Sequence, residues 1–244
     1  MRKKLIILAI WIIIWEILAL IINNAILFAS PIDTVKALFG LLSRAEFYKS
    51  IGNSLLNIIL GMLSGIAVGS VFAIAGRRFK VFDEFAGPFI RLCRTVPVVC
   101  FIVIFLIWFG APRISFFIVL SVTIPLVYIN LSAALKGVDS KLLEMADIFE
   151  MKKSYIIHYI YYPQIYESVK ASLTLIAGVA FKSGAAAEVI GQTGFSLGNG
   201  IYRSKINLDT PGIFAWTLVI IALSFITEKL VVYLAGRFMP GAED

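Results

Sequence analysis

Residues 51–76 read IGNSLLNIILGMLSGIAVGSVFAIAG and carry no charged side chain. A helix needs about 20 mostly apolar residues to cross the hydrocarbon core of a bilayer, so this segment predicts a membrane-spanning helix. Gly61, Gly65 and Gly69 recur every four residues within it and therefore share one helix face. Because a glycine face lets a second helix approach closely, we predict helix packing there. A hinge in a moving helix is the alternative.

The rest of the chain has the same apolar character. Of its 244 residues, 60% are apolar and 15% are charged, against about 25% charged in an ordinary soluble domain. This composition, with a mean hydropathy of +0.93, excludes a soluble enzyme, a disordered chain and a secreted disulfide scaffold. We predict an all-α polytopic membrane protein with about six transmembrane helices. The other five spans are expected at Leu5–Phe28, Thr95–Pro112, Ile114–Leu135, Ile165–Val189 and Thr210–Thr227.

The distribution of lysine and arginine predicts the orientation, because these residues accumulate in cytoplasmic connections. With the N-terminus inside, thirteen of them lie on the cytoplasmic side: Arg2, Lys3, Lys4, Arg77, Arg78, Lys80, Arg91, Arg94, Lys136, Lys141, Lys152, Lys153 and Arg237. Six lie on the opposite side: Lys36, Arg44, Lys49, Arg113, Arg203 and Lys205. We therefore expect both termini to be cytoplasmic. The same pattern explains the net charge of +7 without a nucleic-acid partner.

The sequence divides into three parts. Residues 1–49 are expected to hold an N-terminal transmembrane helix and an external connection, residues 50–237 the main membrane domain, and residues 238–244 a C-terminal tail. A cleaved signal peptide is the alternative for the first span, but its apolar run exceeds the roughly 7–15 residues of a signal core. The external connections at 29–50 and 191–209 are expected to be polar loops.

Few residues suited to metal binding or catalysis are present. Cys93 and Cys100 are the only cysteines and His158 is the only histidine. Two thiols without a histidine or carboxylate partner make a poor metal site. We expect no metal site, no catalytic residue and no bound cofactor in this chain.

Residues 136–164 form a charged connection on the predicted cytoplasmic side. Asp139 or Ser140 is suited to cap a helix through LLEMADIF. The apolar residues of that helix recur at three- and four-residue spacing: Leu142, Met145, Ala146 and Phe149. An amphipathic helix needs an apolar partner, which is the protein's own membrane bundle, the lipid headgroup layer or a further molecule. The spacing alone does not choose among them.

The segment EMADIFEMKKSYIIHYIYYP resembles the EAA loop in permeases of type I binding-protein-dependent ABC importers. That loop reads E-A-A, three residues, G, twelve residues and P. Glu144, Ala146 and Pro163 keep this register. Met145 replaces the first alanine, and Glu150 replaces the glycine. If the turn needs a positive φ at the glycine, glutamate is strained there by about 1 kcal/mol or more.

The resemblance extends over residues 30–237 to segments typical of the nitrate, taurine and sulfonate branch of that family. These segments are Ser30-Pro31, Arg94-Thr95-Val96-Pro97-Val98, Trp108-Phe109-Gly110, Ala187-Glu188-Val189-Ile190-Gly191 and Gly194-Phe195-Ser196-Leu197-Gly198. The resemblance implies the type I permease fold, with the ABC transmembrane domain at 50–237 and its coupling loop at 136–164.

The resemblance also implies partners. A second permease subunit of the same or a homologous kind, a dimer of cytosolic ABC ATPases and an extracytoplasmic solute-binding protein are expected. The sequence contains no GxxxxGK[ST] phosphate-binding loop, so ATP and Mg would bind to the ATPase and this chain would not itself be an enzyme. The implied function is import of a small solute across a prokaryotic cytoplasmic membrane.

In the family, the EAA loop forms short coupling helices in a groove of the ATPase. The resemblance therefore assigns ATPase coupling to seven residues: Leu142, Glu144, Met145, Ala146, Phe149, Glu150 and Pro163. Ala146 would allow close approach to the ATPase, and Glu144 would face a charged groove wall. Leu142 and Phe149 would be apolar anchors. Pro163 is expected to end the cytoplasmic helix before the fifth span, since proline disfavours helical geometry in the preceding residue.

Two ionisable residues of the fifth span are candidates for the translocation path, because charged groups are costly inside a membrane and mark function. Lys182 lies 17 residues beyond the start of the predicted span, and we hypothesise that it favours an anionic solute such as a sulfonate or carboxylate. Glu188 follows six residues later, about 240° around an ideal helix, so the two are not expected to pair. A lysine that snorkels outward or pairs between helices is the alternative for Lys182.

An ATPase-independent secondary transporter or channel is the competing function. It also has several spans with polar residues inside them, but it needs no long cytoplasmic lever and often shows inverted repeats. An intramembrane enzyme would require a nucleophile with its base, or metal ligands, within the spans. The sequence shows neither arrangement. We therefore favour the importer permease.

Overall fold

The computed structural model describes residues 2–238, and within that range the chain is helical with no strand. The predicted all-α class is confirmed. The predicted tail at 238–244 lies outside the described residues except for its first residue. The elements are α1 (Arg2–Ile22), α2 (Pro31–Leu42), α3 (Ala45–Arg78), α4 (Lys80–Thr95), α5 (Val98–Phe109), α6 (Ile114–Lys136), α7 (Ser140–Ile148), α8 (Lys153–Ile156), the π-helical turn η1 (Ile157–Tyr161), α9 (Tyr162–Gly191), α10 (Leu197–Ile206) and α11 (Thr210–Phe238).

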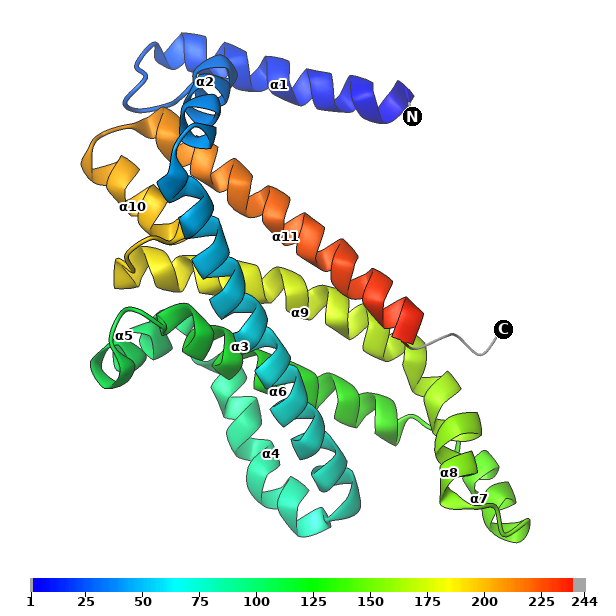
Figure 1. Cartoon of the computed structure of the whole chain (residues 1–244). Coiled ribbons are helices and arrows are strands. Elements are labelled where there is room, and N and C mark those ends of the chain that lie inside the picture. The colour runs from blue at the N-terminus through cyan, green and yellow to red at the C-terminus, as the bar shows by residue number, and fades with distance from the viewer. Residues whose placement is uncertain (1, 239–244) are drawn as a thin grey trace.

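Three long helices, α3, α6 and α9, form the core of the bundle (Figure 1). Their buried side chains are Ile58, Met62, Val119, Val127, Ile176, Ala177, Ala180 and Phe181. Gly61, Gly65 and Gly69 all face α6, where there is no room for a side chain. A Cβ atom on Gly61 would lie 2.6 Å from a backbone oxygen of α6. On Gly65 it would lie 2.6 Å from the Cβ of Thr123, and on Gly69 2.7 Å from the Cβ of Val127.

Among the described residues, five helices are long and apolar enough to cross a membrane, and counting the bent pair α4 and α5 as one span gives six. The span predicted at Thr95–Pro112 is not a single helix of that length. The chain bends by 102° between α4 and α5, and α5 has only 12 residues. Val96 between them is extended, with φ −69° and ψ 130°, because the ring of Pro97 disfavours helical geometry in the residue before it.

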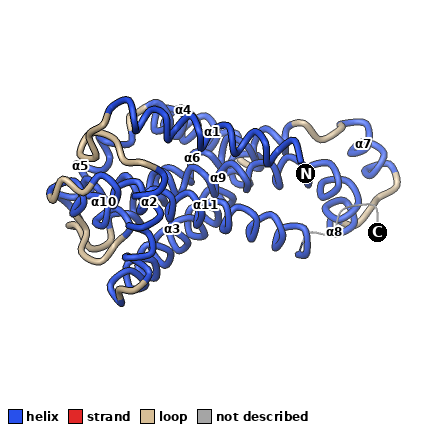
Figure 2. Tube along the Cα trace, turned by 90° about the horizontal axis from the view of Figure 1, so that it is seen from above, coloured by secondary structure: helices blue, strands red, loops and turns tan. Residues whose placement is uncertain are grey.

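The helices α7 and α8 lie at one end of the molecule, and α5 and α10 lie at the other (Figure 2). The start of α1 and the end of α11 both point towards the end that holds α7 and α8 (Figures 1 and 2). This arrangement agrees with a topology in which both termini and the charged connection share one side of the membrane.

The external connections contain helices, so the polar loops predicted at 29–50 and after α9 are wrong. Their helix starts are capped by serines: Ser30 Oγ accepts a hydrogen bond from the backbone N–H of Asp33 at 3.1 Å. Ser196 Oγ accepts one from the backbone N–H of Asn199, also at 3.1 Å. Such N-caps stabilise a helix by about 1 kcal/mol, which lets these short polar segments become α2 and α10.

Candidate functional site

Residues 138–161, here called the projecting module, stand clear of the bundle (Figures 1 and 2). The module includes α7, α8 and η1. The carboxylate of Asp139 accepts a hydrogen bond from the backbone N–H of Lys141 at 2.9 Å and so caps α7. The backbone N–H of Asp139 donates to Oε1 of Gln164, also at 2.9 Å. The start of the module therefore follows α6 along the chain and is also held to α9 by this bond.

One side of α7 packs inside the module. Ala146 is completely buried there, and it lies in a small core with Val138, Ile160 and Leu143. This position corrects the expectation that Ala146 would itself meet an ATPase. Its small side chain instead allows α7 to pack closely against η1.

The other side of α7 is apolar and unpartnered within the described chain. We call Leu142, Met145, Ile148 and Phe149 the outer apolar face. Ile148 is 80% exposed and Phe149 is 72% exposed, whereas most large apolar side chains of a soluble surface occur singly. Glu144 is exposed on the same helix. Ile148 was missed by the sequence analysis, although it follows Met145 at helical spacing.

Glu150 lies two residues after the end of α7 and has a left-handed conformation, with φ 50°. The backbone N–H of Met151 donates to the carbonyl of Ala146 at 2.9 Å, and that of Glu150 donates to the carbonyl of Asp147 at 3.1 Å. These two bonds define a Schellman motif, whose left-handed position is usually glycine. The glycine of the EAA pattern thus has a physical explanation, and Glu150 occupies its position at a cost of about 1 kcal/mol.

Pro163 does not end a helix, which corrects the sequence prediction. It is the second residue of α9, and η1 joins α8 to α9 without a break. Proline lacks an N–H and its ring collides with the carbonyl four residues earlier in a regular α-helix. The wider π-helical turn before Pro163 removes that conflict, so the helix continues from the module into α9 without a break.

Lys182 is exposed on α9 and borders a cavity of about 300 Å³ between α9 and α11. Phe181, Ile220 and Phe225 contribute apolar walls, and Ser224 is a second polar group in the lining. No acidic residue among the described ones forms an ion pair with Lys182. Its ammonium group is therefore free to meet a ligand or a lipid headgroup.

Glu188 is only 1% exposed and joins three helices. Its Oε2 accepts hydrogen bonds from Ser54 Oγ at 2.8 Å and from the backbone N–H of Gly198 at 3.1 Å. Ser54 Oγ in turn accepts one from the backbone N–H of Leu197 at 2.9 Å. The carboxylate lies at the N-terminus of α10, where the helix dipole favours negative charge. It is enclosed by α3, α9 and α10 and does not pair with Lys182, so a lining role would require this cluster to open.

A polar cluster at the other end of the core was missed by the sequence analysis. Lys136 Nζ lies 3.0 Å from Oδ2 of Asp83, and the hydroxyl of Tyr128 donates to the second carboxylate oxygen. The cluster ties the first turn of α4 to the second half of α6. No sequence pattern points to this cluster, because these partners are 45 and 53 residues from Asp83.

Comparison with known families gives a match over residues 65–239 to the model described as "Binding-protein-dependent transport system inner membrane component". That match covers most of the chain. The predicted resemblance to type I importer permeases is confirmed at the level of the family.

Individual proteins give the same result. The permease protein SsuC of Bacillus subtilis, whose name refers to aliphatic sulfonates transport, is 26% identical over 97% of this chain and 86% of its own length. The taurine transport system permease TauC of Escherichia coli is 24% identical over 80% of this chain and 71% of its own length. A solved inward-facing structure of the MetNI methionine ABC transporter matches with a TM-score of 0.55 at 11% identity, covering 81% of this chain and 97% of that chain.

Proposed function

Since the chain belongs to the family of binding-protein-dependent transport system inner membrane components, we propose that it is a permease subunit driven by a separate ATPase through the projecting module. The observation that carries this proposal is the outer apolar face. A group of large apolar side chains on a helix that stands clear of its own bundle needs a protein partner or lipid to cover it. The location of the module at the end towards which the start of α1 and the end of α11 point (Figure 2) favours a cytosolic protein.

The attachment of the module suggests how force reaches the membrane helices. The module follows α6 directly and continues into α9 without a break in the helix. The Asp83–Lys136 ion pair joins α6 to α4 only four residues before α7 begins. A displacement of α7 by a closing ATPase pair is therefore carried to α4, α6 and α9 together, and differential contact with the two ATPase states supplies the work.

The proposed solute is a small anion delivered by an extracytoplasmic binding protein. The names of SsuC and TauC refer to sulfonates and taurine, which carry a sulfonate group. Lys182, unpaired beside a cavity within a predicted span, is a group suited to such an anion. ATP and Mg would bind to the ATPase, and the complex would contain two permease subunits in a prokaryotic cytoplasmic membrane.

The test is affinity purification of the tagged chain from its native membrane in mild detergent, with mass spectrometry of the proteins that accompany it. We expect an ABC ATPase in the wild-type sample. Phe149→Ser removes one anchor of the outer apolar face, and because burial of such a side chain contributes about 1.5–3 kcal/mol, ATPase affinity should fall about 10- to 100-fold.

Lys152→Ser is the matched control, because Lys152 is exposed on the same module outside the outer apolar face and serine is a favourable N-cap for α8. It should retain the ATPase. Equal recovery from the Phe149→Ser and control samples would place the docking surface elsewhere. If no ATPase accompanies the wild-type chain, an ATPase-independent transporter or channel becomes the better proposal.

A further inference from the structure

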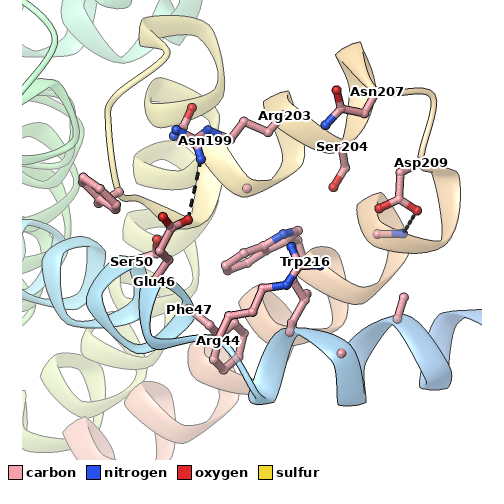
Figure 3. A pocket seen from close by; sticks show the side chains of 16 residues that line it. Arg44, Glu46, Phe47, Ser50, Asn199, Arg203, Ser204, Asn207, Asp209 and Trp216 are labelled. Carbon is pink, nitrogen blue, oxygen red and sulfur yellow. Dashed lines mark hydrogen bonds and ion pairs between the residues drawn. The ribbon is translucent and has the colours of Figure 1, made fainter.

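A cavity of about 390 Å³ opens at the end of the molecule opposite the projecting module. It lies where α2, the start of α3, α10 and the start of α11 meet, and Figure 3 shows its side chains. Its volume falls in the range of small-molecule sites, about 300–1,000 Å³. It is separate from Lys182, from the Glu188 cluster and from the module, so none of the roles proposed above uses it.

The floor of the cavity is aromatic and rigid. Trp216 is 7% exposed and its ring centroid lies 5.2 Å from that of Phe47. The helix α10 packs closely against the indole: a Cβ on Gly200 would lie 2.3 Å from Trp216 Cε2. A fixed aromatic surface of this kind suits the carbon portion of a small organic ligand.

Two arginines line the cavity from different elements. Arg44 precedes α3 and Arg203 belongs to α10 (Figure 3). No acidic residue among the described ones pairs with Arg44. Arg203 Nη1 lies 3.7 Å from Glu46 Oε2, but both side chains are more than half exposed. Such a pair contributes only about 0–1 kcal/mol, so a ligand can replace it.

We propose that this cavity binds a small organic oxyanion, a sulfonate or phosphate group on a short carbon skeleton. Guanidinium groups bind tetrahedral oxyanions through paired charge-assisted hydrogen bonds, and the indole of Trp216 packs against the skeleton. The oxyanion has two sources at this end of the molecule: the transported solute, or the phosphate of an outer-leaflet lipid headgroup. The solute source rests on the proposed function, whereas the affinity of the cavity for an oxyanion does not.

The test uses the full chain in nanodiscs made only of phosphatidylcholine, titrated with ethanesulfonate and followed by tryptophan fluorescence. We expect a saturable signal that disappears in Trp216→Phe. Arg44→Gln and Arg203→Gln should each weaken binding about tenfold or more. Lys205→Gln is the matched control, because Lys205 is exposed on α10 but does not line the cavity, and it should bind as the wild type does.

A second arm measures retention of phosphatidylglycerol by native mass spectrometry. Arginine-dependent retention of this lipid without ethanesulfonate binding would support the oxyanion site with a lipid as its source. Absence of both, or binding that neither arginine variant changes, overturns the proposal. ATPase recovery with the Arg44→Gln chain is measured in parallel. If the ATPase is recovered but the wild-type chain does not bind the oxyanion, the cavity proposal fails and the importer proposal does not.

Discussion

Gly65→Ala adds one methyl group where α3 meets α6, and the cost follows from the geometry. The new Cβ would lie 2.6 Å from the Cβ of Thr123 and 2.8 Å from its Cγ2. Carbon atoms in contact stay about 3.5–4.0 Å apart, so the two helices must separate locally by about 1 Å. The Cβ of Thr123 is bonded directly to the backbone, so a change of side-chain rotamer does not move it away. Overpacking of this kind costs about 1–3 kcal/mol.

Alanine also favours a helix over glycine by about 1 kcal/mol, so the clash must be separated from this gain. Gly178→Ala provides the reference, because Gly178 is also helical and nothing lies within 4 Å of its added Cβ. The difference between the two variants isolates the clash. For a chain of this size each kcal/mol shifts the unfolding midpoint by about 2–4 °C.

Thermal unfolding of both variants in the same detergent should therefore place Gly65→Ala about 4–8 °C below Gly178→Ala for a clash of about 2 kcal/mol. Equal midpoints would refute the close-packing argument. They would mean that α3 and α6 separate at little cost there, as a hinge in α3 requires.

Other variants test single positions. Glu150→Gly should raise the free energy of unfolding by about 1 kcal/mol, because glycine adopts the left-handed conformation without strain. Glu150→Ala should give no such gain when both variants are measured by the same thermal unfolding. Glu188→Ala should destabilise the chain by about 1–3 kcal/mol more than Glu188→Gln, since glutamine keeps an acceptor for Ser54 and Gly198; equal losses would show that these bonds contribute little. Lys182→Met should reduce solute uptake by the reconstituted complex, and unchanged uptake would remove Lys182 from the path.

Hydropathy predicted the long membrane helices because a bilayer demands long apolar segments. It did not predict how the chain is built around Pro97. The segment at Thr95–Pro112 is apolar throughout, yet Pro97 divides it from the preceding helix and turns the chain by 102°. Composition measures partition into the membrane, whereas the direction of the chain depends on one local backbone conformation.

The periodicity of α7 predicted a helix but not which side faces the partner. Both sides of α7 are apolar, so spacing alone placed Ala146 and Phe149 on one surface. The structure buries Ala146 and exposes Phe149. The clusters around Asp83 and Glu188 were beyond prediction for a different reason. Tyr128 and Lys136 are 45 and 53 residues from Asp83, and Ser54 is 134 residues from Glu188, so only the packed helices bring these groups together.

The π-helical turn η1 has a consequence for combining permeases by recombination. Each residue of an α-helix turns the chain by about 100° around the helix axis. A π-helical turn is equivalent to one residue added to the helix. Deleting one residue from Ile157–Tyr161 would rotate the outer apolar face by about a quarter turn around the axis of α9, with every residue of that face intact. The rotation of the outer apolar face relative to α9 is therefore determined by residues outside that face. A chimera that exchanges α7 between permeases must therefore also exchange η1, so that the outer apolar face keeps its orientation relative to α9.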